Sequence, residues 1–170
     1  MPHSLANLNA CDRAAFVAAL GHLFEHSPWV AEETWPERPF RDAPHLHAAL
    51  CATLRSASLA KQLALIRAHP DLAGRLARQN QLTKESTAEQ ATAGLNRLTD
   101  AELAEFQKLN DAYRTKFEFP FVICARLNAK DAILAAMRAR LPNSPAAEQA
   151  AALTEIEKIA WLRLEDTLKT

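Results

Sequence analysis

The stretch TDAELAEFQKLNDAY, residues 99–113, decides the fold class. It begins with Thr99 and Glu102, whose spacing is that of a capping box at a helix N-terminus. Apolar side chains then recur at helical spacing along one stripe that also holds a single amide: Leu103, Phe106, Leu109, Asn110 and Tyr113. The pattern predicts a long helix with one buried face.

Helix signals of this kind recur on both sides of that stretch. Candidate N-cap residues are Asp12, Ser27, Ser58, Asn128 and Ser144, and Ser27 and Ser144 each precede a proline. The chain has only three glycines, and FPFVI at residues 119–123 is its one short β-like run. We therefore expect an all-α fold, a single-domain bundle of roughly seven to nine helices over residues 1–170.

Composition excludes several classes of partner. Basic and acidic residues number 20 each, so the net charge is zero and gives no electrostatic case for nucleic acid or an anionic membrane. No apolar run approaches the roughly 20 residues that span a bilayer. The three widely spaced cysteines argue against a disulfide framework, and the first residues show no basic region followed by an apolar one, so we expect no secretory signal. We expect a cytoplasmic protein that binds neither nucleic acid nor membrane.

A histidine stands directly before a proline in LIRAHPDLAGRLA, residues 65–77. The proline disfavours helix at His69, so His69 should lie outside both flanking helices, at the N-cap of a short helix that begins with Pro70. Histidine is a poor N-cap. One interpretation is a tolerated loop histidine, and the other is an imidazole kept for chemistry.

The run LTKESTAEQATAGL, residues 82–95, also allows two interpretations. Ser86 and Glu89 have capping-box spacing, which is a purely structural role. Alternatively, Ser86, Glu89 and Gln90 share one helix face and together could bind a small polar ligand. A carboxylate close to His69 would favour the imidazolium and fix the orientation of its ring.

Two further features are weaker signals. FPFVI packs aromatic side chains at a bend, but its non-helical backbone also needs hydrogen-bond partners that a planar, amide-rich ligand could supply. Arg163 is either a surface charge on the last helix or a bidentate partner for a carboxylate. His22 and His26 lack the glutamate of a zinc motif, so we predict no metal site.

Taken together, these motifs resemble the family of 2-oxo-4-hydroxy-4-carboxy-5-ureidoimidazoline (OHCU) decarboxylases. The resemblance rests on AHPDLAGR (68–75), LTKESTAEQATAGL (82–95) and FQKLNDAYRTKFEFPFVICAR (106–126), with a similar tail, EIEKIAWLRL (155–164). The motifs occur in the family's order and cover nearly the whole chain. The resemblance implies an all-helical carboxy-lyase that converts OHCU to (S)-allantoin in urate catabolism, without metal or organic cofactor and usually as a homodimer.

The resemblance also implies roles for individual residues. His69 would be the central catalytic residue, acting as general acid/base, with Glu89 beside it. The implied substrate contacts are Pro70, Ser86, Gln90, Phe119, Phe121, Ile123 and Arg163.

One departure from the family pattern is Glu118, which stands where the family commonly has glycine. If the backbone there needs a positive φ, glutamate is awkward, although its side chain could turn to solvent. Two rival functions remain open at this point. The chain could be a helical interaction module in which His69, Ser86 and Glu89 have only structural roles, or an enzyme of the same fold that acts on another ureido-imidazole.

Overall fold

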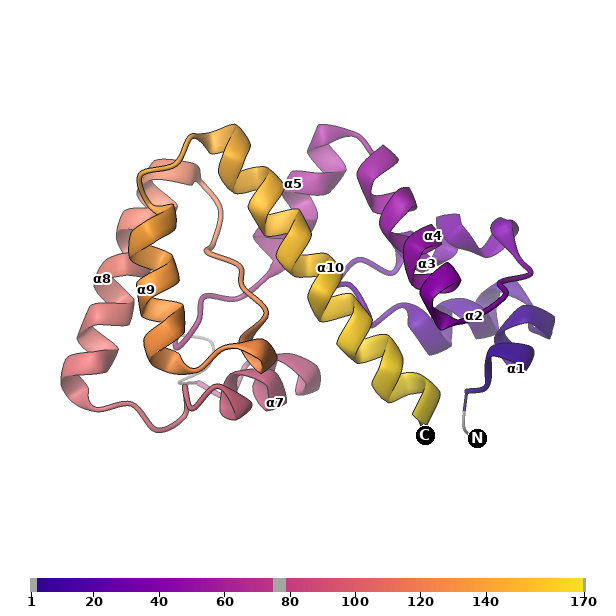
Figure 1. The fold of residues 1–170 in the computed structure, drawn as a ribbon, viewed down its shortest axis with the longest axis horizontal. Helices are drawn as coiled ribbons and strands as arrows, with labels where there is room; N and C mark the ends of the chain where they lie inside the picture. The colour runs from indigo at the N-terminus through magenta and orange to yellow at the C-terminus, as the bar shows by residue number, and fades with distance from the viewer. Residues whose placement is uncertain (1–2, 75–78, 170) are drawn as a thin grey trace. The chain divides into compact units, whose positions relative to one another are not determined.

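The expected all-α fold is confirmed. The computed structural model describes residues 3–74 and 79–169, and within them it contains nine α-helices, two 3₁₀ helices and no strand (Figure 1). The chain divides into two compact units, unit 1 (Met1–Ala68 and Glu157–Thr170) and unit 2 (His69–Ile156). Whether residues 1–170 behave as a single domain stays a prediction.

Unit 1 is built from short helices packed around leucine and phenylalanine side chains. It holds α1 (Leu5–Ala10), α2 (Arg13–Leu20), α3 (Trp29–Thr34), η1 (Trp35–Glu37), α4 (Ala43–Ser56), α5 (Leu59–Ala68) and the second half of α10 (Pro145–Lys169). Helix α3 packs against α2 and α4, and Phe16, Leu20, Leu46 and Leu50 are fully buried. Their burial follows from the apolar faces that the sequence places on these helices.

Unit 2 contains every predicted site residue except Arg163. It holds α7 (Lys84–Thr92), α8 (Asp100–Phe117), η2 (Ala125–Leu127), α9 (Lys130–Arg140) and the first half of α10. Helix α8 packs against α9, and α7 packs against η2. Phe106 and Tyr113, from the stripe predicted on α8, are buried, so that prediction is confirmed.

Most of the predicted caps are present. Thr99 and Glu102 form the complete capping box of α8. The side chains of Asp12, Ser58 and Ser144 accept hydrogen bonds from the backbone N–H three residues later, at 2.8, 3.3 and 3.2 Å. These short local bonds depend on sequence spacing alone, which is why the sequence predicted them correctly.

Three predicted caps are wrong. Thr83 rather than Ser86 caps α7, so Ser86 lies inside the helix. Helix α9 begins at Lys130 after Ala129, and the Asn128 amide instead donates to the Cys124 carbonyl at 3.0 Å. Ser27 does not cap α3, because its hydroxyl donates to the Glu25 carbonyl.

Glu118 ends α8 in the left-handed conformation, with φ 61° and ψ 21°. The sequence analysis considered a positive φ at this position and a side chain turned to solvent. Both are present, since the backbone of Glu118 has positive φ and its side chain is exposed. A left-handed C-cap favours glycine. Glycine would therefore suit this backbone better than the glutamate present here.

Candidate functional site

His69 lies at the start of a non-helical loop, residues 69–74, which we call the anchored loop. Helix α5 ends at Ala68, and the His69 side chain is only 7% exposed. Pro70 is half-buried. The histidine thus lies outside α5, as predicted, but the prediction that a helix begins at Pro70 is wrong, because residues 70–74 are not helical. The rest of that predicted helix, residues 75–78, lies outside the described residues.

Side chains from α7 and α8 hold this loop. The Gln90 Oε1 accepts from the N–H of Ala73 at 3.0 Å, and its Nε2 donates to the Asp71 carbonyl at 3.4 Å. From α8, Asn110 Nδ2 donates to the Leu72 carbonyl at 2.9 Å, and Arg114 Nε donates to Asp71 Oδ1 at 2.8 Å. Together these bonds fix the backbone that follows His69.

The glycine of the HPDLAG sequence is required by close packing in the same loop. A Cβ at Gly74 would lie 2.6 Å from the Asp71 Cβ, which is closer than real Cβ atoms approach. Any larger residue would push the two ends of the loop apart.

Helix α7 presents the three polar residues that the sequence analysis singled out. Ser86 and Gln90 are 5% and 6% exposed, and Glu89 is half-buried. Because Thr83 supplies the cap, the cap role considered for Ser86 and Glu89 does not explain why these residues are present. Gln90 is bonded to the anchored loop, as described above, so its amide supports the backbone after His69.

The 119–124 segment joins α8 to η2 and is buried throughout. Phe119 and Phe121 pack edge-on against Tyr113, with ring centroids 6.0 and 5.4 Å apart. Side chains satisfy three of its backbone groups. The Val122 carbonyl accepts from Arg140 at 2.8 Å, the Cys124 N–H donates to Glu155 at 2.9 Å, and the Cys124 carbonyl accepts from Asn128 at 3.0 Å.

The backbone groups of Phe121 and Ile123 are different. Among the described residues, no protein group is hydrogen-bonded to the N–H or C=O of either residue, although the two are only 1% and 8% exposed. Buried backbone groups almost always have partners. Their free groups are therefore available to a bound ligand or to water.

Glu89 connects α7 electrostatically with this segment. Burial raises the pKa of the Cys124 thiol, and the carboxylates of Glu155 and Glu89 raise it further. The Glu89 carboxylate therefore lies within electrostatic range of the end of the segment, consistent with the packing of α7 against η2. A thiol with a raised pKa is a poor nucleophile at neutral pH.

Arg163 lies in unit 1, on the second half of α10. Its Nη2 donates to Glu25 Oε2 and its Nη1 to the His22 carbonyl, both at 3.0 Å. The side chains of Arg163 and Glu25 are 4% and 2% exposed. Arg163 is therefore a buried ion-paired residue rather than a surface charge, and its contact with substrate stays a prediction.

Comparison with known proteins decides between the rival interpretations. The family model described as OHCU decarboxylase matches residues 9–165. The chain belongs to the OHCU decarboxylase family. It is 45% identical to the 2-oxo-4-hydroxy-4-carboxy-5-ureidoimidazoline decarboxylase of Halalkalicoccus jeotgali, over 96% of this chain and 90% of that one. It is 37% identical to the mouse (Mus musculus) decarboxylase of the same name, over 96% and 92%.

Solved structures agree with this assignment. A crystal structure of (S)-allantoin synthase matches with a TM-score of 0.77 and 32% identity, over 98% of this chain and 54% of that one. A crystal structure of OHCU decarboxylase in the presence of (S)-allantoin matches with a TM-score of 0.72 and 22% identity, over 94% and 100%, and supports the fold. Membership of the OHCU decarboxylase family makes the chain an enzyme and leaves the interaction-module hypothesis without support.

In this member of the OHCU decarboxylase family, a hollow of about 520 Å³ lies against α7. Ala73, Thr87, Gln90 and Ala91 are among its lining residues, whereas His69 and Glu89 are not. Among the described residues, no group of three or more His, Cys, Asp or Glu side chains could hold a metal ion, and no helix could cross a membrane.

Sequence reasoning missed the residues that hold the site segments in place. Asn110 and Arg114 anchor the loop after His69, while Arg140 and Glu155 hold the 119–124 segment. One signal was visible for Asn110, because it is an amide within the buried stripe of α8. For the other three residues, nothing local marks the contact.

Proposed function

We propose that this chain decarboxylates OHCU to (S)-allantoin in urate degradation. Membership of the OHCU decarboxylase family, over residues 9–165, carries the proposal. Unit 2 supports it with a buried histidine, a polar helix face and backbone groups at Phe121 and Ile123 that have no protein partner within residues 3–74 and 79–169. Such groups suit a planar ring substituted with ureido and carbonyl functions.

The substrate carries a carboxylate and a hydroxyl on the same ring carbon. Cleavage of the carbon–carbon bond releases CO₂, the electron pair forms a carbon–carbon double bond in the ring, and the nitrogen of the adjacent ring C=N takes up a proton. The hydroxyl proton then leaves as the carbonyl forms, and a proton is added to the carbon that bears the ureido group. Hydrogen-bond donors must stabilise the negative charge that develops on the ring between the loss of CO₂ and the addition of protons.

In this proposal, His69 acts as general acid/base at the substrate hydroxyl. His69 lies just after the end of α5, and hydrogen bonds from side chains of α7 and α8 hold the backbone that follows it. The backbone that carries the imidazole is therefore fixed in position. The Glu89 carboxylate either orients the imidazole and favours its protonated form, or accepts hydrogen bonds from the N–H groups of the substrate. Ser86, Pro70, and the backbone of Phe119, Phe121 and Ile123 contact the ring, and proton delivery to one face sets the (S) configuration.

Three finer parts of the proposal rest on the family resemblance. Gln90 and Arg163 contact substrate, with Arg163 receiving its carboxylate. The chain works as a homodimer, which light scattering at working concentration would test. It acts in the cytoplasm without a metal or organic cofactor, so extensive dialysis against a chelator should leave its activity unchanged.

The activity is tested with OHCU generated enzymatically in a cuvette and used fresh. Free OHCU decays without an enzyme, so the test compares circular dichroism at the allantoin band with and without the chain. The proposal expects a rapid signal of (S)-allantoin only when the chain is present. An unchanged rate and a racemic product would contradict it, and faster turnover of a related ureido-imidazole would favour the shifted-substrate alternative.

A further inference from the structure

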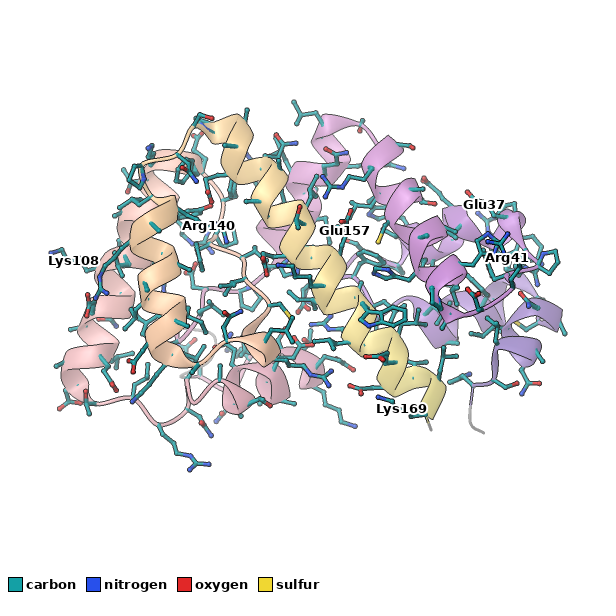
Figure 2. All side chains as sticks on the ribbon, in the orientation of Figure 1. Glu37, Arg41, Lys108, Arg140, Glu157 and Lys169 are labelled. Carbon is teal, nitrogen blue, oxygen red and sulfur yellow. The ribbon has the colours of Figure 1, made fainter. Side chains whose placement is uncertain are left out.

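Arg140, the last residue of α9, reaches the 119–124 segment from the side (Figure 2). Its Nη1 donates to the Val122 carbonyl at 2.8 Å. Its guanidinium carbon lies 4.3 Å from the centroid of the Phe121 ring, in a cation–π contact. One side chain thus holds both the backbone and a ring of the segment.

A buried carboxylate fixes this guanidinium in turn. Glu148 is fully buried, and its oxygens accept from Arg140 Nε at 3.0 Å, from Asn143 Nδ2 at 2.9 Å and from the Tyr113 hydroxyl. The bond from Tyr113 links the carboxylate to the aromatic ring that packs against Phe119 and Phe121. A half-buried arginine whose partner carboxylate is fully buried has little freedom to move.

Over residues 121–124, the backbone groups that are held by side chains belong to every second residue. The Val122 carbonyl is taken by Arg140 and the Cys124 N–H by Glu155, whereas Phe121 and Ile123 have no protein partner among the described residues. Alternation with a period of two is the pattern of an extended run, whose successive residues direct their polar groups to opposite edges. One edge is therefore occupied by protein side chains, and the other is left for a ligand.

We propose that Arg140 is a positioning residue for the OHCU reaction: by holding the Val122 edge, it directs the backbone groups of Phe121 and Ile123 toward the substrate ring. The inference rests on the proposed function and goes beyond it, because Arg140 does not itself contact substrate. It acts through the segment, so its loss should weaken substrate binding more than the chemical step.

The planar guanidinium is essential to this role. It donates to the Val122 carbonyl and to Glu148 through different nitrogens while its face covers Phe121. Lysine keeps the positive charge and can still pair with Glu148, but a single ammonium lacks the flat fork that makes all three contacts together. Arg140→Lys therefore separates the positioning role from the buried ion pair.

The experiment measures KM, kcat and the enantiomeric purity of allantoin for the parent and for Arg140→Lys. We expect KM to rise about tenfold, the size of effect expected when a hydrogen bond from a charged group is lost, with a smaller change in kcat and less pure (S)-allantoin. Arg138→Lys is the matched control, since Arg138 lies on the same helix in an exposed pair with Glu105, and its KM should equal that of the parent.

A double variant covers the case in which Arg140→Lys does not fold. Arg140→Gln with Glu148→Gln removes both charges together and so leaves no unpaired buried charge. It should show the same rise in KM. If the parent is active and a folded Arg140→Lys or double variant keeps the parental KM, the inference about Arg140 is overturned while the proposed function stands. A parent that leaves OHCU decay unchanged overturns the proposed function and this inference with it.

Discussion

The side chain of Gln90 is hydrogen-bonded to the backbone of Ala73, with 3.0 Å between Gln90 Oε1 and the N–H nitrogen. The bond joins α7 to the loop that begins at His69. It means that the helix face carrying Ser86 and Glu89 and the loop carrying the imidazole are held together inside one unit.

Gln90→Leu removes both bonds to the anchored loop at nearly constant volume. The buried N–H of Ala73 loses its partner, so we expect unfolding free energy to fall by about 1–3 kcal/mol in a urea titration. We also expect OHCU turnover to fall at least about tenfold, because an imidazole without a fixed position is a weaker general acid/base. Gln107→Leu, at an exposed position on α8, is the control and should leave turnover unchanged. Equal turnover in Gln90→Leu and the parent would mean that the loop needs no support from α7.

Asn110→Leu removes the bond to the Leu72 carbonyl. Asn110 Oδ1 is buried and has no hydrogen-bond partner among the described residues, so the substitution also removes an unsatisfied acceptor. The two effects oppose each other, and we expect a stability loss of only about 1 kcal/mol. The folded variant should lose much of its OHCU turnover although it keeps most of its stability. A large stability loss with unchanged turnover would contradict a role in holding the His69 loop.

Glu118→Gly should stabilise the protein. Glu118 has φ 61°, and a non-glycine residue in the left-handed region costs about 1–2 kcal/mol. Glycine accepts this backbone freely but has greater freedom in the unfolded chain, so we expect a net gain of about 0.5–1 kcal/mol by chemical denaturation. Glu118→Ala, which keeps a Cβ, should not gain stability. A glycine variant less stable than the alanine variant would show that Glu118 makes a contact worth more than the strain.

Glu148 should contribute to the acid sensitivity of the fold. Burial opposes its ionisation, but hydrogen bonds from Arg140, Tyr113 and Asn143 outweigh burial and lower its pKa below the usual 4.5. A lowered folded-state pKa adds stability that is present above pH 4.5 and is lost as pH falls below it through the folded-state pKa. The unfolding free energy of the parent should therefore fall more steeply below that pH than that of Glu148→Gln.

The same substitution leaves the Arg140 charge without its partner, so at neutral pH we expect a cost on the order of 3 kcal/mol. Glu105→Gln removes the exposed partner of Arg138 and serves as the control, with an expected effect of about 1 kcal/mol or less. Parallel acid profiles for the parent and Glu148→Gln would contradict the lowered pKa.

The sequence predicted the features that depend on local spacing. The capping box of Thr99 and Glu102 spans four residues and forms as expected, and the positive φ suspected at Glu118 is present. The prediction that Ser86 is a helix cap was wrong. Its spacing to Glu89 matches a capping box, but Thr83, three residues earlier, makes the cap. Several residues near one helix start can supply a cap, and the helix boundary decides between them.

The supports of the site depend on contacts that no local pattern encodes. Gln90 reaches Ala73 across 17 residues, Arg140 reaches Val122 across 18, and Glu155 reaches Cys124 across 31. Each contact exists because helices pack in a particular register, which a single sequence does not reveal. The candidate catalytic and substrate-contact residues were identified through the family motifs. The residues that hold them in place can be identified only in the folded structure.

The most direct test of the account compares the parent chain with His69→Asn on fresh OHCU, with allantoin followed by circular dichroism. Asparagine is polar and shorter, so the helical fold should remain, as far-ultraviolet circular dichroism would verify. General acid–base catalysis is worth about 10²–10⁴-fold, and the account predicts a loss of that size in the rate of (S)-allantoin formation. A folded His69→Asn variant that makes (S)-allantoin at the parental rate would contradict the central claim.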